Sequence, residues 1–246
     1  MDYRSRTYRR RVRGDGVVSF PVSLKESDLL ISVDRESYSP ELPEYALSLL
    51  AGIRRELEQY ITRDQKFRRA LIPHPLLPGA PRIARLMAAA ARRAGVGPMA
   101  AVAGAVSEVL GRKLLPMAKE IIVENGGDIY FHTQHPIRVG VFAGPSVLSN
   151  KVTLMVSSGS RGRGVCTSSS TVGPSLSFGC ADAAVVISHS AALADAAAST
   201  LGNIVQGEED ISPALEKVHK IKGILGTAVI LGDKLGVMGD VELVLK

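Results

Sequence analysis

The sequence has no tryptophan, only two cysteines and few aromatic residues of any kind. Phe and Tyr together make up 4% of the 246 residues, so the core has to be built from Ala, Val, Leu and Ile. The two cysteines, Cys166 and Cys180, lack CxxC spacing and fit a reducing compartment without disulfides. The basic start of the chain lacks the apolar segment of a secretory signal, so we expect a cytoplasmic protein.

Long apolar runs are also missing. The most apolar stretch, Ala181 to Leu201, contains Asp182, His189 and Asp195, so it does not read as a membrane span, and no membrane association is expected. A chain of 246 residues can bury a substantial core. We expect one domain over residues 1–246.

Positive charge is concentrated at the start of the chain. The formal net charge is +6, and residues 1–14 contain Arg4, Arg6, Arg9, Arg10, Arg11 and Arg13. Only Tyr3 and Tyr8 accompany them, whereas nucleic-acid readers usually interleave basic and aromatic residues on a structured face. The pattern favours a solvated basic N-terminal segment over a phosphate-contacting arm, and nucleic acid is not the expected partner.

The spacing of apolar residues predicts an α+β fold. Helical periodicity predicts helices at residues 42–61, 82–94, 98–115, 191–205 and 211–221. Short apolar runs predict strands at residues 17–23, 29–33, 137–142, 152–156, 183–188, 229–231 and 241–245, and a hairpin at 121–131. Residues 72–81 are rich in proline, and residues 159–179 are rich in Gly and Ser without an apolar period, so both are expected to be connectors.

One arrangement recurs along the chain. An Ala-rich helix, a second helix and then strands occur at residues 82–131 and again at 191–245. This is either an internal duplication or the common alternation of helices and strands. The small side chains of the Ala-rich helices can pack closely on a sheet, or can pair in a homodimer.

Asp195 and Ser199 stand four residues apart on a predicted helix, so both oxygens project from one face. A carboxylate and a hydroxyl at this spacing can hold Mg²⁺, which also keeps waters or takes substrate phosphates. The alternative is an exposed Asp and a Ser bonded back to its own helix.

Two further segments carry polar groups that could act on a ligand. Residues 165–179 bring seven hydroxyl side chains into a segment with glycines, which can cradle phosphate or form a plain loop. Cys166 there could be a nucleophile or a small buried residue. His132 and His135 could share a metal, but no Cys and no third His lie nearby in the sequence.

The run from Ile121 to Phe131 contains Asn-Gly and Gly-Gly pairs, which are strong hairpin signals because they supply positive φ cheaply. A tight turn does not require Glu124, Asn125 and Asp128 around those glycines. The cluster therefore leaves open a second role, as one wall of a ligand site.

Three segments together, VENGGDIYF, TSSSTVGPSLSFGCADAAVV and SAALADAAASTLGN, resemble the ApbE superfamily of flavin transferases. In that superfamily a GGD turn, a TSG-like segment and an ADAxAT helix recur in this order. The resemblance is closer to a small ApbE-like branch of archaea and bacteria, and it covers nearly the whole chain. It implies an ApbE-like (T-fold-related) layered structure, with largely antiparallel sheets packed against Ala-rich helices. It also implies FAD as substrate or ligand, Mg²⁺ as cofactor, and a protein whose Thr accepts FMN.

The resemblance also implies roles for individual positions. Asp195 matches the metal-ligating Asp of the ADAxAT helix, and Ser199 matches its Thr. The implied cofactor-binding residues are Asn125, Gly126, Gly127 and Asp128 of the turn, Thr167, Ser168 and Ser169 of the TSG-like segment, and a loop at Ala103 and Gly104. No catalytic residue is assigned.

The sequence departs from the transferases in two places. Ala103-Gly104 stands where they carry Lys-Gly, and their His-x-x-Asp-Pro-x-Thr-Gly segment is not found. We therefore expect a protein that binds a flavin nucleotide with Mg²⁺ and has altered or absent FMN transfer. The alternatives are a genuine FMN transferase with a cytoplasmic target, and a non-catalytic partner of an enzyme in sulfur or amino-acid metabolism.

Overall fold

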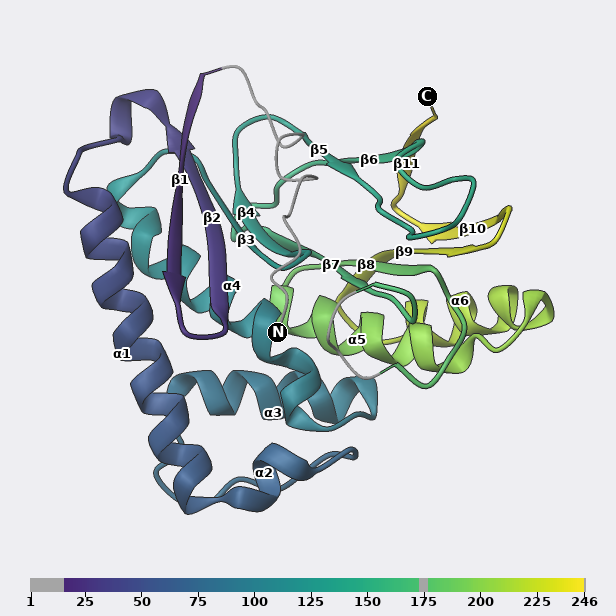
Figure 1. Ribbon diagram of the computed structural model, residues 1–246, viewed down its shortest axis with the longest axis horizontal. Coiled ribbons are helices and arrows are strands. Elements are labelled where there is room, and N and C mark those ends of the chain that lie inside the picture. The colour runs from purple at the N-terminus through teal and green to yellow at the C-terminus, as the bar shows by residue number, and fades with distance from the viewer. Residues whose placement is uncertain (1–15, 173–176, 246) are drawn as a thin grey trace.

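The computed structural model describes residues 16–172 and 177–245 (Figure 1). The basic segment expected at residues 1–14 lies outside these ranges. Within them, the chain forms two sheets and a set of helices, and every strand pair is antiparallel. The α+β fold with largely antiparallel sheets is confirmed.

The larger sheet has eight strands in the order β1-β2-β3-β4-β7-β8-β9-β10. Their bounds are β1 Val17–Leu24, β2 Ser27–Asp34, β3 Ile121–Asn125, β4 Asp128–His132, β7 Arg163–Ser168, β8 Ala183–Ser188, β9 Ile224–Leu231 and β10 Lys234–Gly239. The two residues between β3 and β4 form the predicted hairpin, with Asn125 opposite Asp128.

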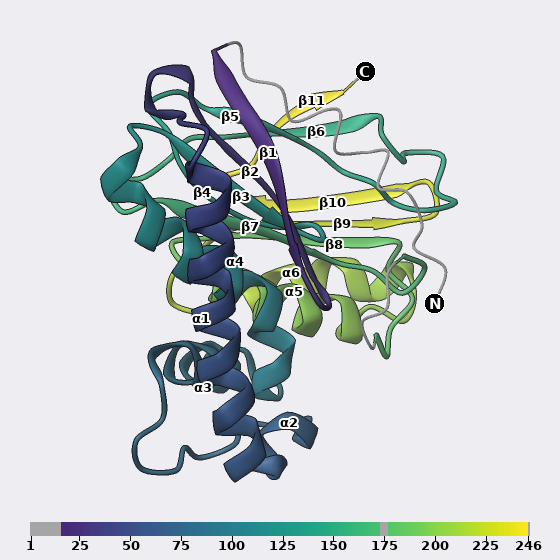
Figure 2. The ribbon, with the colours of Figure 1, turned by 60° about the vertical axis from the view of Figure 1, so that its left-hand side comes forward.

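Helices cover one face of this sheet (Figures 1 and 2). They are α1 Leu42–Arg63, α2 Gln65–Arg69, α3 Arg82–Ala94, α4 Val102–Leu114, α5 Ala191–Ile204 and α6 Ile211–His219, with short 3-10 turns η2 Arg35–Ser37, η3 Pro98–Ala101, η4 Leu115–Met117 and η5 Glu208–Asp210. From α1 to α6, four of the helices contact strands directly: α1 packs on β1, α4 on β3 and β4, α5 on β7 and β8, and α6 on β9 and β10. α3 packs mainly on α5 and η3, in an outer layer.

The opposite face of the large sheet carries the small sheet, in the order β11-β6-β5. Its strands are β5 Ile137–Gly140, β6 Val152–Val156 and β11 Glu242–Leu245. The main apolar core lies between the helices and the large sheet. A second apolar cluster fills the space between the two sheets and includes Phe131, Leu154 and Ile187. The fold is thus layered as helices, large sheet and small sheet.

Two strands were not predicted from the sequence. Residues 163–168 were expected to be part of a connector, but they form β7, a buried strand between β4 and β8. β10 was also missed. Residues 72–81 contain no helix or strand, as predicted. Whether residues 82–131 and 191–245 are an internal duplication or an ordinary alternation of helices and strands stays open.

Among the described residues, no single helix is long and apolar enough to cross a membrane. The pair formed by Arg82–Ala94 and Pro98–Met117, bent by 105°, has the required length and composition only when the two are taken together.

Candidate functional site

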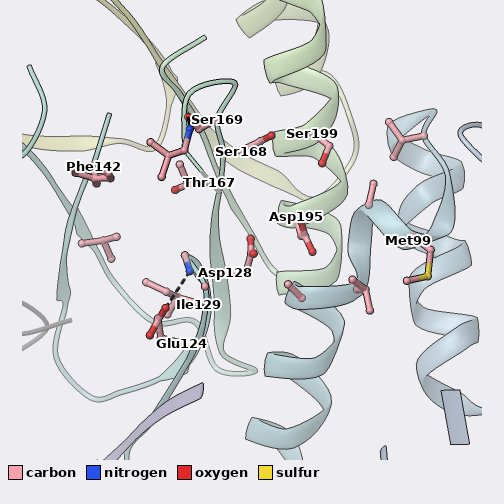
Figure 3. A pocket seen from close by; sticks show the side chains of 18 of the residues that line it. Met99, Glu124, Asp128, Ile129, Phe142, Thr167, Ser168, Ser169, Asp195 and Ser199 are labelled. Atoms are coloured by element: carbon pink, nitrogen blue, oxygen red, sulfur yellow. Dashed lines mark hydrogen bonds between the residues drawn. The ribbon is translucent and has the colours of Figure 1, made fainter. Parts of the chain in front are cut away.

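A cavity of about 740 Å³ lies where the β3–β4 hairpin ends and β7 continues. β4 pairs with β7 only from Ile129 to Phe131, so β7 extends past the hairpin turn while it remains paired with β8. The cavity occupies this notch in the sheet. Its walls come from β2, the β3–β4 hairpin, β5, β6, β7, β11, α2, η3, α4 and α5. Figure 3 shows Thr167 and Ser168 of β7 beside Asp195 and Ser199 of α5.

The turn between β3 and β4 forms one wall of the cavity, through Gly126 and Gly127. Gly126 and Gly127 have φ values of 71° and 107°, a left-handed conformation that glycine adopts without strain. The Glu124 carboxylate accepts a hydrogen bond from the Gly127 N–H at 3.1 Å. The Asn125 amide donates to the Ala103 carbonyl at 3.2 Å, which ties the hairpin to the start of α4. The polar residues of the turn therefore do more than close a hairpin.

Asp195 lies on α5 at the cavity wall, one turn before Ser199 (Figure 3). Its Oδ2 accepts the Gly104 N–H at 2.9 Å. That N–H belongs to the first turn of α4, where helix N–H groups lack partners and favour a negative charge. The resemblance implied a loop at Ala103 and Gly104, whereas the periodicity predicted a helix over residues 98–115; the structure places both residues in the first turn of α4, as the periodicity predicted.

A side chain of α4 in turn caps the start of α5. The buried Glu108 accepts hydrogen bonds from the Ser190 hydroxyl at 2.6 Å and the Ala192 N–H at 3.3 Å, both at the start of α5. Its second oxygen accepts from Arg112 at 2.9 Å. Each helix therefore supplies a carboxylate to the N-terminus of the other, and this fixes the position of Asp195.

Asp128 lies across from Asp195 at the edge of the cavity (Figure 3). Burial and the negative charge of Asp128 raise the pKa of Asp195 well above its usual range, against the hydrogen bonds from Gly104 and Ala103. A divalent cation would relieve this repulsion. The oxygen donors at hand, two carboxylates and the Ser199 hydroxyl, are of the type that Mg²⁺ binds, so the residues fit such an ion.

The protein groups would not complete the coordination of a cation by themselves. Among the described residues, no group of three or more His, Cys, Asp or Glu side chains is arranged to hold a metal ion. A cation at Asp195 would therefore take its remaining ligands from waters and from the bound substrate. The same result gives no support to a metal site at His132 and His135.

The hydroxyl-rich segment divides into two parts. Thr167 and Ser168 are the last residues of β7, and both line the cavity together with Ser169. The Ser169 hydroxyl accepts the N–H groups of Thr171 and Val172 at 3.1 and 3.0 Å, so it also shapes its own turn. Residues 167–169 therefore line the cavity, and residues 169–172 form a turn held by the Ser169 hydroxyl.

Cys166 is buried on the helix-facing side of β7. Its Sγ donates to the Ala191 carbonyl at 3.3 Å. Burial, with the charges of Asp128 and Asp195, raises the pKa of this thiol well above its ordinary value. The structure supports a small buried residue over a nucleophile.

Sequence reasoning missed the residues that β5 and its extension bring to the cavity, Arg138, Gly140 and Phe142. It also missed Phe178, which follows the turn after β7, and Met99 of η3. The alternation of Ile137, Val139 and Val141 with polar or exposed neighbours was a usable signal for one outward face, but it could not say what that face would meet.

A family model described as AbpE bacteria matches residues 9–236. The chain belongs to this family. Among relatives of this ApbE-like protein, the UPF0280 protein MJ1526 of Methanocaldococcus jannaschii is 41% identical over 230 residues, which cover 92% of each chain. A UPF0280 protein of Methanococcoides burtonii is 40% identical over 220 residues, covering 89% of this chain and 91% of the relative.

Solved ApbE structures share the fold. The flavin transferase ApbE from Vibrio cholerae superposes with a TM-score of 0.51 at 14% identity, covering 91% of this chain and 96% of that one. The ApbE protein of Thermotoga maritima gives a TM-score of 0.57 at 10% identity, covering 89% and 96%. The ApbE-like resemblance read from the sequence is thereby confirmed at the level of family and fold.

Proposed function

We propose that this ApbE-like protein binds a flavin nucleotide, FAD in the first instance, together with Mg²⁺, and that its FMN transfer to protein threonine is altered or absent. The observation that carries the proposal is the facing pair Asp128 and Asp195, beside Ser199, in a cavity of about 740 Å³. Ligand pockets of roughly 300–1,000 Å³ hold small molecules and cofactors, so the space suits a nucleotide.

The residues that would hold Mg²⁺ are Asp195 and Ser199, with Asp128 close enough to add negative charge. Bound there, the cation would neutralise phosphate oxygens of the nucleotide. The glycines of the turn let a ligand approach the backbone, since a Cβ on Gly127 would meet nothing within 4 Å. Thr167 and Ser168 add hydroxyl donors to the same space.

The lining of the cavity supports altered transfer. The cavity-lining residues that the structure describes include neither His nor Lys, so the wall offers no imidazole or amine to deprotonate an acceptor hydroxyl. Phe178 enters the cavity from the interval in which the transferases carry their His-containing segment. Binding can therefore persist where the transfer chemistry has changed.

Calorimetry with FAD, with and without Mg²⁺, tests binding. We expect FAD to bind in the presence of Mg²⁺ and Asp195→Asn to lose the Mg²⁺-dependent part, because the amide cannot supply the negative charge. Asp233→Asn, at an exposed position beside Lys234, is the matched control and should bind like wild type. Absence of binding at millimolar FAD contradicts the proposal.

Genuine FMN transfer is the second candidate, favoured by the fold shared with proteins named as flavin transferases. It predicts covalent flavin, visible as fluorescence in a denaturing gel, on a co-expressed target that carries an acceptor Thr. Loss of this label in Asp195→Asn, with the label retained in Asp233→Asn, would favour transfer over binding alone.

A further inference from the structure

Alternate residues of β5 and its extension are exposed at the cavity. Ile137, Val139 and Val141 are buried toward the large sheet, and Val139 also reaches the cavity wall. Arg138, Gly140 and Phe142 alternate with them, are exposed and line the cavity. The alternation runs two residues past the end of β5. The cavity therefore meets, in order along the chain, the guanidinium of Arg138, the backbone of Gly140 without a side chain, and the ring of Phe142.

Arg138 has no partner within the described part of the chain: it forms neither an ion pair nor a hydrogen bond there. Arg112 and Arg163, which are more buried than Arg138, are paired with Glu108 and Asp240. A guanidinium held at a cavity wall without a carboxylate suits a phosphate, which it can bind with two parallel hydrogen bonds.

Gly140 is not required by the protein's own packing. A Cβ at this position would meet nothing within 4 Å, and its φ is not in the left-handed region. The residue opposite it on β6 is Thr153, which also lines the cavity. Because Gly140 has no side chain, the backbone between Arg138 and Phe142 is exposed to the cavity, and a planar ring can pack against it.

Phe142 is 40% exposed, so a large apolar ring faces the cavity at a cost in hydration. Aromatic side chains gain by stacking on nucleobases. Figure 3 shows Phe142 on the wall away from Asp195 and Ser199, with Thr167 and Ser168 between them. The second exposed phenyl of the cavity, Phe178, is held on the α5 side, because its N–H donates to Asn203 of α5 at 2.9 Å.

We propose that Arg138, Gly140 and Phe142 form a subsite for the adenylyl half of the dinucleotide. The inference rests on the proposed function. If the pyrophosphate meets the cation at Asp195, the two ring systems extend to opposite sides of it. The larger isoalloxazine suits the helix side of the cavity, where Leu71, Val96, Met99 and Ala100 give an apolar surface and Arg68 of α2 lies at the wall. The purine then lies on β5, with its phosphate toward Arg138.

The test compares FAD with FMN, which lacks the adenylyl half. In calorimetry with Mg²⁺, we expect Gly140→Val to weaken FAD binding about tenfold or more, while FMN binding stays within about twofold of wild type. Valine favours a strand, and a Cβ at this position meets nothing within 4 Å, so the melting temperature should not fall. Arg138→Gln should weaken FAD selectively in the same way, and ADP should compete with FAD less well in that variant.

Arg55→Gln, at an exposed site on α1, is the control for loss of one positive charge. Unchanged FAD affinity in both Gly140→Val and Arg138→Gln overturns the subsite. Equal losses for FAD and FMN also overturn it, because they place the flavin half on β5. Wild-type protein that binds neither nucleotide contradicts the proposed function itself, and is thereby distinguished from failure of the subsite alone.

Discussion

Asp195 serves the fold and the cavity with one carboxylate. Its Oδ2 accepts the Gly104 N–H, while burial and Asp128 make its negative charge costly. Replacing it by Ala would remove both the cap on α4 and the cavity oxygens. Asn keeps an acceptor for Gly104 and changes only the charge, so it separates the two roles.

Gly104 is the residue that permits this contact. A Cβ there would lie 2.3 Å from the Ala191 carbonyl oxygen and 2.8 Å from the Asp195 Cβ, so α4 and α5 would have to separate. We expect Gly104→Ala to destabilise the protein by roughly 1–3 kcal/mol in urea unfolding, the usual cost of overpacking.

Gly52→Ala on α1 is the matched control, because a Cβ there meets nothing within 4 Å. It should stabilise the protein by up to about 1 kcal/mol, since alanine is the better residue inside a helix. Equal effects of the two substitutions would show that helix propensity, and not the α4–α5 contact, decides the result at Gly104.

Among the elements, the end of β2 is held by one side chain. The Asp34 carboxylate accepts the Lys119 and Glu120 N–H groups at 2.9 and 3.0 Å, just before β3, and also bonds Ser37 of η2. Burial opposes its ionised form, but these hydrogen bonds outweigh burial and lower the pKa of Asp34 below its ordinary value of 3.8.

This lowered pKa makes the contribution of Asp34 depend on pH. A carboxyl with a lower pKa in the folded state stabilises it above the unfolded pKa, and the effect disappears as pH falls through the folded value. At pH 7, Asp34→Asn should cost roughly 1.5–3 kcal/mol, typical of hydrogen bonds to a charged group. The gap to wild type should shrink below pH 3.8. Denaturant titrations across this range, with the exposed Asp233→Asn as control, measure it; a constant gap would contradict the assignment.

The elements that the sequence predicts well are those whose signal is local. The 3.6-residue period of α1 and the glycines at residues 126 and 127 need no distant partner to be recognised. β7 and β10 were missed for a tertiary reason. A Cβ on Gly164 of β7 would lie 2.2 Å from the Ala191 Cα, and one on Gly236 of β10 would lie 2.4 Å from the Ile211 Cγ2. These glycines let helices approach, but in the sequence they read as loop residues.

The residues of the candidate site also differ in whether a local sequence signal marks them. The turn at Asn125–Asp128 and the pair Asp195 and Ser199 carry ordered motifs, so their positions could be read from the sequence. Arg138 and Phe142 carry no motif, and they reach the cavity only because β5 belongs to a sheet stacked on the first one. Such a juxtaposition depends on topology, which residue spacing does not encode.

For the whole molecule, the proposed cation site at Asp195 predicts that Mg²⁺ raises the stability of the fold. A ligand that binds only the folded state adds about 2.7 kcal/mol when its concentration is 100 times its dissociation constant. For a protein of this size, that corresponds to a rise in melting temperature of roughly 5–10 °C. We expect Mg²⁺ to raise the melting temperature of wild type, and EDTA to reverse the rise.

Asp195→Asn should melt higher than wild type without Mg²⁺, because it removes one of two repelling charges, and should not respond to the ion. Asp233→Asn should respond as wild type does. NaCl at matched ionic strength separates specific binding from screening. A rise in Asp195→Asn equal to that of wild type would place the cation elsewhere.

The mutual capping of α4 and α5 has a mechanical consequence. Glu108 holds the first turn of α5 while Asp195 holds the first turn of α4, so neither helix can slide or rotate without breaking both contacts. The wall that carries Asp195 is therefore held by two contacts that have to break together. On the opposite wall, β5 leads into residues 141–151, a stretch without helix or strand, so that wall has no comparable pair of helix caps.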